Sequence, residues 1–349
     1  MKNVITRPPL LAPSKQMRKW FIILSALPIL CSVQTASSQE IEKGVTVQRG
    51  WFNSRTQIEP IQVKNTNGDQ IKGMKRVAIS VFNVAFPDEF DIKAESSGTI
   101  GTGLSGIWGS HKTATLHTKL VGMDIAARQR IADAAYGDFV DQLKAAGFEV
   151  IGHAELVAAA PEISTWTSLP NGSPGRFGTY VAPTGLNIYP MNGDERKRES
   201  SGMFRQVNQA VSFASTTQAY KRSAYVARDA NTYVLAVSMV VDYAVYSTSG
   251  DRRGFGKRVS AGFEKGAAVA AGTMIDPATT VRVWNTESGG FPTLLTLQQP
   301  VISDADIGSE SGSPGDWTVT TTPELFTPPA TDVIKRANGA LVATLVDRR

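Results

Sequence analysis

Three glycines have a spacing that could bind a phosphate group. Gly101, Gly103 and Gly106 match G-x-G-x-x-G, the pattern with which a βαβ unit holds a dinucleotide at a helix N-terminus. That chemistry needs a strand that ends at the first glycine and a helix that begins at the last. Here the preceding apolar run ends near Phe86, and an alternating segment follows the glycines. We therefore interpret residues 98–110 as a flexible glycine loop and expect no cofactor there.

A second phosphate-binding pattern, the P-loop, fails at two positions. Gly256 and Lys257 have the correct order, but Asp251 stands where the first glycine is required. Arg258 replaces the Ser or Thr whose hydroxyl would hold Mg²⁺. The sequence therefore gives no support for nucleotide binding at this point of the chain.

Two aspartates begin a spacing that could bind calcium. Asp304 and Asp306 occupy the first two ligand positions of a calcium-binding loop. In the same register Ser309 falls where glycine is required, and Gly315 falls where a bidentate glutamate is required. We interpret residues 303–316 as a solvated acidic loop without a bound metal.

Histidine, serine and cysteine patterns add no reactive centre. His111, His117 and His153 lack metal-ligand spacing, and no G-x-S-x-G motif occurs. Cys31 is the only cysteine, which excludes an intramolecular disulfide, a zinc knuckle and an iron–sulfur cluster. We expect no catalytic, cofactor-binding or metal-binding residue. A carboxylate pair from distant loops would leave no motif, so a carboxylate-dependent hydrolase stays an alternative.

The amino-terminal residues have the layout of a secretory signal peptide. Arg18 and Lys19 are followed by an apolar run over residues 20–33 and by a small-residue cleavage site that ends at Ser38. The run is shorter than the roughly 20 residues that span a bilayer. The layout that begins at Met17 is complete by itself, which makes Met17 a second candidate for the start. We expect residues 1–38 to be removed and the mature protein to be periplasmic or associated with an outer membrane.

Cleavage would also remove the apparent basic character of the chain. The 349 residues contain 36 Lys and Arg, 31 Asp and Glu, and a net charge of +5. Five of the basic residues and none of the acidic ones lie within residues 1–38, so the mature chain is neutral. A neutral, exported chain excludes a nucleic-acid partner. The residues before Cys31 are Pro28, Ile29 and Leu30, which are too large for a lipidation motif, so we do not expect lipidation.

The elements that position these residues follow from hydrophobic periodicity. Strands are predicted at 77–86, 112–121, 148–151, 232–247, 280–284 and 294–301, and helices at 124–146, 206–231 and 330–346. The best helix has apolar residues at helical spacing, followed by a glycine suited to a left-handed cap: Ile131, Ala135, Phe139, Leu143 and Gly147.

The remaining segments indicate one domain with long insertions. Residues 39–75 form a polar amino-terminal extension, residues 91–111 are loop-like, and residues 161–204 are rich in Pro, Gly and Asn. We expect residues 76–349 to form a single α+β domain with an α/β-like core, in which helices flank a mixed sheet. Long loops or hairpins are expected at 161–204 and 302–329.

One basic cluster with an aromatic residue inside it precedes a partly alternating strand. Residues 251–275 are therefore a candidate interface or membrane-facing hairpin. Its candidate residues are Arg252, Arg253, Phe255, Lys257, Arg258, Phe263 and Val269. The alternative is the edge hairpin of a soluble sheet, since alternation over one segment is weakly specific.

The order of the elements resembles that of the curli secretion channel family. Val77-Ala-Ile-Ser-Val-Phe-Asn, the helix around residues 134–143, and Gly147-Phe-Glu-Val-Ile resemble its opening β-α-β. The amino-terminal domain of the Tol-system translocation protein shares this opening. Residues 232–243 are similar to the family's central strand, and residues 281–289 to its strand–turn. The resemblance implies an envelope-assembly fold whose membrane hairpins would occupy residues 247–279 and 302–329.

Two classes of function follow from these patterns. The first is an exported, non-enzymatic structural or assembly component of an outer-membrane or periplasmic secretion system. It would associate with itself, with other envelope proteins and with the outer membrane. The second is a soluble periplasmic ligand-binding module, with residues 98–110 and 161–204 as its binding surface.

Overall fold

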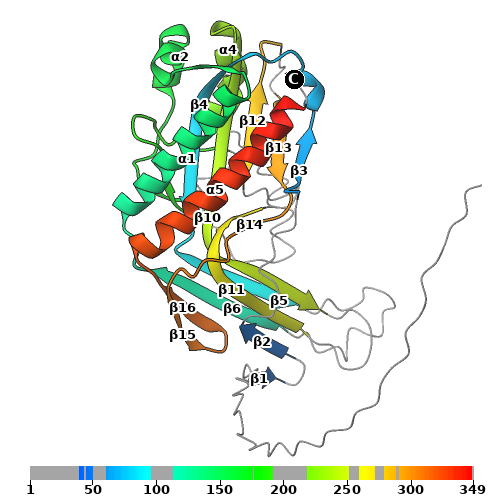
Figure 1. Cartoon of the computed structure of the whole chain (residues 1–349), viewed down its shortest axis with the longest axis vertical. Helices are drawn as coiled ribbons and strands as arrows, with labels where there is room; N and C mark the ends of the chain where they lie inside the picture. The colour runs from blue at the N-terminus through cyan, green and yellow to red at the C-terminus, as the bar shows by residue number, and fades with distance from the viewer. Residues whose placement is uncertain are drawn as a thin grey trace, which may run out of the picture. The chain divides into compact units, whose positions relative to one another are not determined.

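The computed structural model describes residues 39–42, 45–49, 60–95, 113–175, 177–191, 218–250, 259–271, 279–287 and 291–347, all within one unit, Ser37–Arg349. Two mixed β-sheets and the helices that cover one of them make up this part of the chain (Figure 1). The expected α+β fold is therefore confirmed. The predicted leader and residues 98–110 lie outside the described residues.

The larger sheet is centred on one strand, β10 (Tyr233–Gly250). Its first half pairs in parallel with β4 (Arg76–Phe86) and antiparallel with β12 (Thr280–Trp284). Apart from Arg76, every β4 residue is buried, as its richness in β-branched and aromatic residues predicts. The other strands of this sheet are β1 (Gln39–Glu42), β2 (Val45–Arg49), β3 (Val63–Thr66), β7 (Glu149–Ile151), β8 (Pro174–Gly175), β9 (Gly178–Val181), β11 (Val259–Val269), β13 (Thr293–Leu297) and β14 (Val301–Ile302).

Two long helices, α1 (Ile125–Ala145) and α5 (Pro323–Val346), cover one face of this sheet (Figure 1). The Asp124 side chain caps α1 by accepting a hydrogen bond from the Ala127 amide at 2.7 Å. Gly147 follows the helix with φ +85°, the left-handed conformation that glycine adopts without strain. The four residues predicted to form the buried stripe of this helix are all fully buried, which confirms that prediction: Ile131, Ala135, Phe139 and Leu143.

Helix α5 begins seven residues before the predicted start at Ala330. Thr322 caps it, Pro323 occupies the first turn, and Phe326 is buried. The interior prolines Pro328 and Pro329, which ordinarily end a helix, led to the shorter prediction. The cap and the buried phenylalanine keep this first part helical despite the two missing amide donors.

The opposite face of the sheet carries shorter elements. Helices α2 (His153–Ala159) and α4 (Gln218–Asp229) pack there with the 3-10 turn η3 (Pro161–Thr165). A second 3-10 turn, η1 (Gly68–Ile71), follows β3. We call described residues 161–175 and 177–191 the covering segment. Its strands β8 and β9 extend the sheet beside β4, and other residues of the segment pack on the sheet face although their composition is loop-like. The rings of Trp166 and Tyr189, both buried, meet edge to face at 5.3 Å within it.

The second sheet has the order β15–β16–β6–β5. It comprises β5 (Glu89–Glu95), β6 (Thr113–Val121), β15 (Ser309–Ser313) and β16 (Asp316–Thr320). The alternation predicted for β6 is confirmed, since Ala114, Leu116, Thr118 and Leu120 are buried. The loop predicted over residues 303–316 is wrong in part, because β15 pairs with β16, which itself pairs in parallel with β6. The loop-like prediction for residues 91–111 likewise fails for 91–95, which lie in β5.

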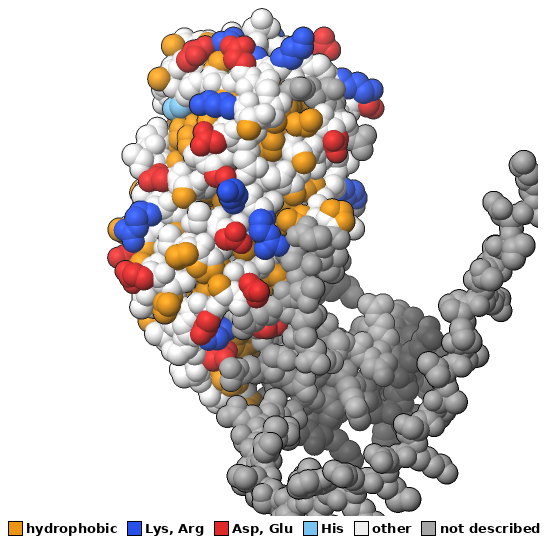
Figure 2. All heavy atoms as spheres, in the orientation of Figure 1, with side chains coloured by type: hydrophobic (Ala, Val, Ile, Leu, Met, Phe, Trp, Pro, Cys, Tyr) orange, Lys and Arg blue, Asp and Glu red, His pale blue; other side chains and the backbone are white. Residues whose placement is uncertain are grey.

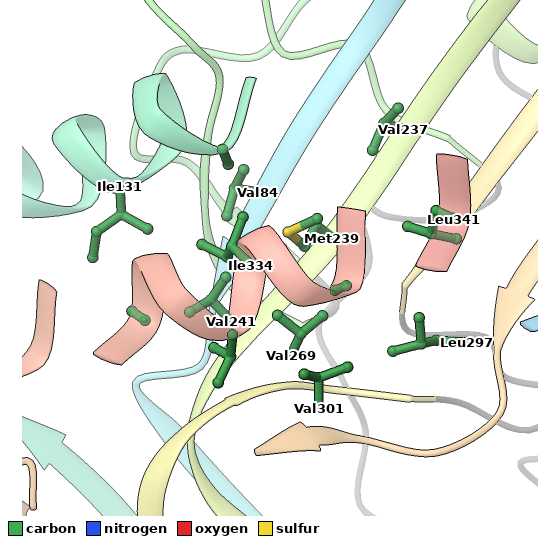
Figure 3. Close-up of a cluster of buried hydrophobic side chains, with 14 of the residues drawn as sticks. Val84, Ile131, Val237, Met239, Val241, Val269, Leu297, Val301, Ile334 and Leu341 are labelled. Atoms are coloured by element: carbon green, nitrogen blue, oxygen red, sulfur yellow. The ribbon is translucent and has the colours of Figure 1, made fainter. Parts of the chain in front are cut away.

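The main hydrophobic core lies between the larger sheet, helices α1 and α5, and the inner face of the second sheet. Figure 3 shows its centre, where Ile334 of α5 lies over Met239 and Val241 of β10, with Val269 and Val301 beside them. One continuous core therefore joins the helix-covered sheet to the second sheet, and the far half of β10 packs against the second sheet.

Candidate functional site

The candidate hairpin is the far half of β10 paired with β11. We call residues 242–250 and 259–268 the arm. The two strands pair antiparallel from Asp242 opposite Ala268 to Gly250 opposite Val259, with one register shift between Asp242 and Ala244. At this bulge the Asp242 carboxylate accepts hydrogen bonds from the amides of Tyr243 (2.7 Å) and Ala244 (3.3 Å). The bulge bends the strand, so the arm leaves the helix-covered sheet and packs on the second sheet (Figure 1).

The structure separates the sequence-predicted residues of this hairpin into two groups. Arg252, Arg253, Phe255, Lys257 and Arg258 lie outside the described residues. Two others lie in the interior core, so their apolar side chains contact this chain and offer no surface to a membrane or partner: Phe263 and Val269.

A buried polar cluster, which the sequence patterns did not single out, joins the arm to the second sheet. The Thr118 hydroxyl lies 2.9 Å from the hydroxyls of both Tyr243 and Tyr246. The Tyr246 ring also stacks at 4.3 Å on Phe90 of β5. The signal in the sequence was a threonine on the otherwise apolar inner face of β6. Cross-sheet hydrogen bonds of this kind fix the orientation of the arm.

Burial raises the pKa values of the two arm tyrosines. For both Tyr243 and Tyr246 desolvation is the largest cause, and the nearby charge of Asp242 raises the pKa further. The hydrogen bond to Thr118 acts in the opposite direction. Both hydroxyls therefore stay protonated through the neutral range and act as hydrogen-bonding groups.

The acidic loop that was considered for calcium binding contacts the ammonium group of a lysine of this chain, Lys265. Lys265 of the arm places its Nζ 2.6 Å from the Asp306 carboxylate and in contact with the Gly308 carbonyl. Its side chain is 14% exposed, so the charge is largely withdrawn from water and paired. Lys265, which interrupts the apolar alternation of the strand, thus ties the arm to residues 304–308. The Asp306 side chain itself is 73% exposed, in agreement with the expectation of a solvated acidic loop at this position.

The outer surface carries charges of both signs. On the second sheet Asp91 and His117 lie 2.6 Å apart, and Glu89 and Lys119 lie 3.3 Å apart. Figure 2 shows acidic and basic side chains interspersed over the visible face. Among the described residues no group of three His, Cys, Asp or Glu side chains could hold a metal ion. None of the helices described here has the length and apolar character needed to span a membrane.

The two described histidines occupy different surroundings. His117 lies on the second sheet, whereas His153 begins α2 and is half-buried. Burial lowers the pKa of His153, and a hydrogen bond to the backbone of Ile79 opposes this effect. In the described part of the chain, neither histidine belongs to a group of three possible metal ligands.

Protonation of His153 is expected to destabilise the fold. Because its pKa is lower in the folded state than in the unfolded state, stability is complete above about pH 6.5 and declines as the pH falls through the folded value. The measurement is the free energy of unfolding in urea between pH 7.5 and 5.5. The decline should be smaller in His153→Gln than in the unsubstituted protein. Equal declines in the two proteins would contradict this assignment.

Comparison with protein-family models, with curated proteins and with solved structures found no match for this chain.

Proposed function

We propose that the chain is an exported, non-enzymatic protein of the cell envelope that acts by assembly with copies of itself or with other envelope proteins. The observation that carries the proposal is the continuity of β10 from the centre of the larger sheet into the arm. Because one strand forms both the centre of the helix-covered sheet and one side of the arm, a partner bound at the arm is held rigidly relative to the rest of the protein. The signal-peptide layout supports an envelope location.

The contacts at the base of the arm support an assembly role. The arm is fixed by the Thr118 cluster on one side and by the Lys265–Asp306 ion pair on the other. These contacts order the arm before any partner binds, which reduces the entropy lost on association. Four of the eight residues that connect its strands, 251–258, are basic, and they supply charge for an acidic partner surface.

Sedimentation velocity in mild detergent, together with membrane fractionation, tests the proposal. We expect species larger than a monomer and co-sedimentation with outer membranes. The double change Arg252→Glu and Arg253→Glu should weaken the association at least tenfold. A matched control makes the same charge change on the exposed face of α4, at Lys221 and Arg228. A strict monomer that never sediments with outer membranes would refute the proposal.

A soluble ligand-binding module is the second candidate. The observation that favours it is a pair of buried side-chain oxygens without hydrogen-bond partners between the sheet and the covering segment, Asn83 Oδ1 and Ser238 Oγ. Binding there is compatible with assembly through the arm, because the pair projects from the sheet face opposite α1 and α5.

A further inference from the structure

Two neighbouring strands place polar side chains side by side under the covering segment. Asn83 of β4 and Ser238 of β10 are paired residues of the parallel ladder, so their side chains project from the same face. Asn83 is fully buried, and Ser238 is 9% exposed. Neither the Asn83 Oδ1 atom nor the Ser238 Oγ atom has a hydrogen-bond partner within the described residues. Adjacent buried groups without partners point to a bound molecule.

The hydrogen bonds around this pair of residues fix which of their atoms are available to a guest. The Asn83 Nδ2 group donates to the Tyr189 carbonyl of the covering segment at 2.8 Å, which leaves Oδ1 as an acceptor. The Ser238 hydroxyl can both donate and accept. On the next strand the Thr280 hydroxyl accepts from Arg282 at 3.0 Å, so that guanidinium is directed to Thr280. The guest must therefore donate to Asn83 and can accept from Ser238.

The surroundings favour a neutral guest. One apolar cluster contains Val81 and Ala236, two residues before the polar pair on each strand. A second contains Ala85 and Val240, two residues after it. A cationic group between two apolar clusters would lack compensation for its lost hydration, and an anion has no proton to donate to Asn83 Oδ1. A hydroxyl satisfies both free atoms without a net charge.

We infer that Asn83 and Ser238 form a buried site for one hydroxyl group, which donates to Asn83 Oδ1 and accepts from Ser238. Solvent water and the alcohol of a carbohydrate or polyol share this chemistry and are the two sources. The site lies where the covering segment meets the sheet, so its occupant joins the Tyr189 region to β4 and β10.

The change Ser238→Ala tests the site, because its effect on the melting temperature has opposite directions with and without a bound guest. Removal of a hydroxyl that lacks a partner relieves a penalty and raises the melting temperature, whereas removal of one that holds a guest lowers it. We expect a fall of about 2–5 °C. Ser80→Ala is the matched control, since Ser80 is a buried serine of β4 (1% exposed) that donates to the Leu235 carbonyl at 3.3 Å. A high-resolution crystal structure should show density within hydrogen-bond distance of both atoms.

The source of the hydroxyl is distinguished with three probes: glycerol, glucose and 1,2-dimethoxyethane, an ether without a hydroxyl. Polyols stabilise proteins generally, so each shift is compared with that of the Ser238→Ala protein. A saturable extra shift with glycerol or glucose, absent in the variant, identifies an organic ligand. A destabilised variant with no extra shift identifies water. An unchanged or higher melting temperature for Ser238→Ala, without density at the site, overturns the inference.

Discussion

Gly122→Ala is expected to destabilise the fold by about 4 kcal/mol or more. Gly122 has φ +103°, and a Cβ at this position would lie 2.0 Å from the Thr321 carbonyl oxygen. The Thr321 amide donates to the Val121 carbonyl at 2.9 Å, so the two chain segments cannot separate without loss of this bond. The same point joins β6 to α1 and β16 to α5, and separation would shift the start of both helices. Equilibrium unfolding in urea measures the loss.

Two other glycines provide matched controls for this prediction. Gly73 also has a positive φ, +77°, but no atom lies within 4 Å of its Cβ position, so Gly73→Ala should cost only about 1–2 kcal/mol. Gly137 lies inside α1 with open space around it, and Gly137→Ala should stabilise the protein by about 0.5–1 kcal/mol. Equal losses for Gly122→Ala and Gly73→Ala would show that the close backbone approach carries no cost.

Periodicity predicted the elements that have one apolar and one polar face. The alternation over β6 and the helical spacing from Ile131 to Leu143 each identify a buried face, because side-chain geometry fixes which residues share it. Strand β15, Ser-Glu-Ser-Gly-Ser, has no apolar face and is exposed. It is a strand because it pairs antiparallel with β16 across the two residues 314 and 315, and its small polar residues show no apolar alternation that would predict this.

The residues of the candidate site show the same limit of prediction from hydrophobic periodicity. Alternation around Phe263 identifies an apolar face but not what covers it, and in the structure the ring lies 5.9 Å from Trp317 of the second sheet. Lys265 interrupts the apolar alternation of the strand. The reason for a lysine there is its ion pair with Asp306, and this partner is 41 residues away in the sequence. The Thr118 cluster likewise joins residues more than 120 positions apart. Hydrogen bonds and ion pairs between residues of different strands and loops can be recognised only when the positions of these segments in the fold are known.

Asn338→Asp is expected to cost about 3–5 kcal/mol at neutral pH. Asn338 is fully buried in α5, and its Nδ2 group donates to the Ala135 carbonyl (3.1 Å) and to the Asp138 carboxylate (2.8 Å) of α1. The substitution would direct a carboxylate at a carbonyl oxygen and at a second carboxylate. Both neighbours disfavour the charged form and raise the pKa of the introduced group, so the loss should shrink as the pH falls toward 5.

A second substitution separates this electrostatic cause from general damage to the helix interface. Asp138→Asn in the Asn338→Asp background supplies an amide that can donate to the introduced carboxylate, so the double variant should recover about 2 kcal/mol of the loss. Asn338→Leu removes the donor without adding charge and should cost about 1–3 kcal/mol with no dependence on pH. If Asp138→Asn gave no recovery and both changes at 338 cost the same, packing rather than charge would determine the stability of the α1–α5 contact.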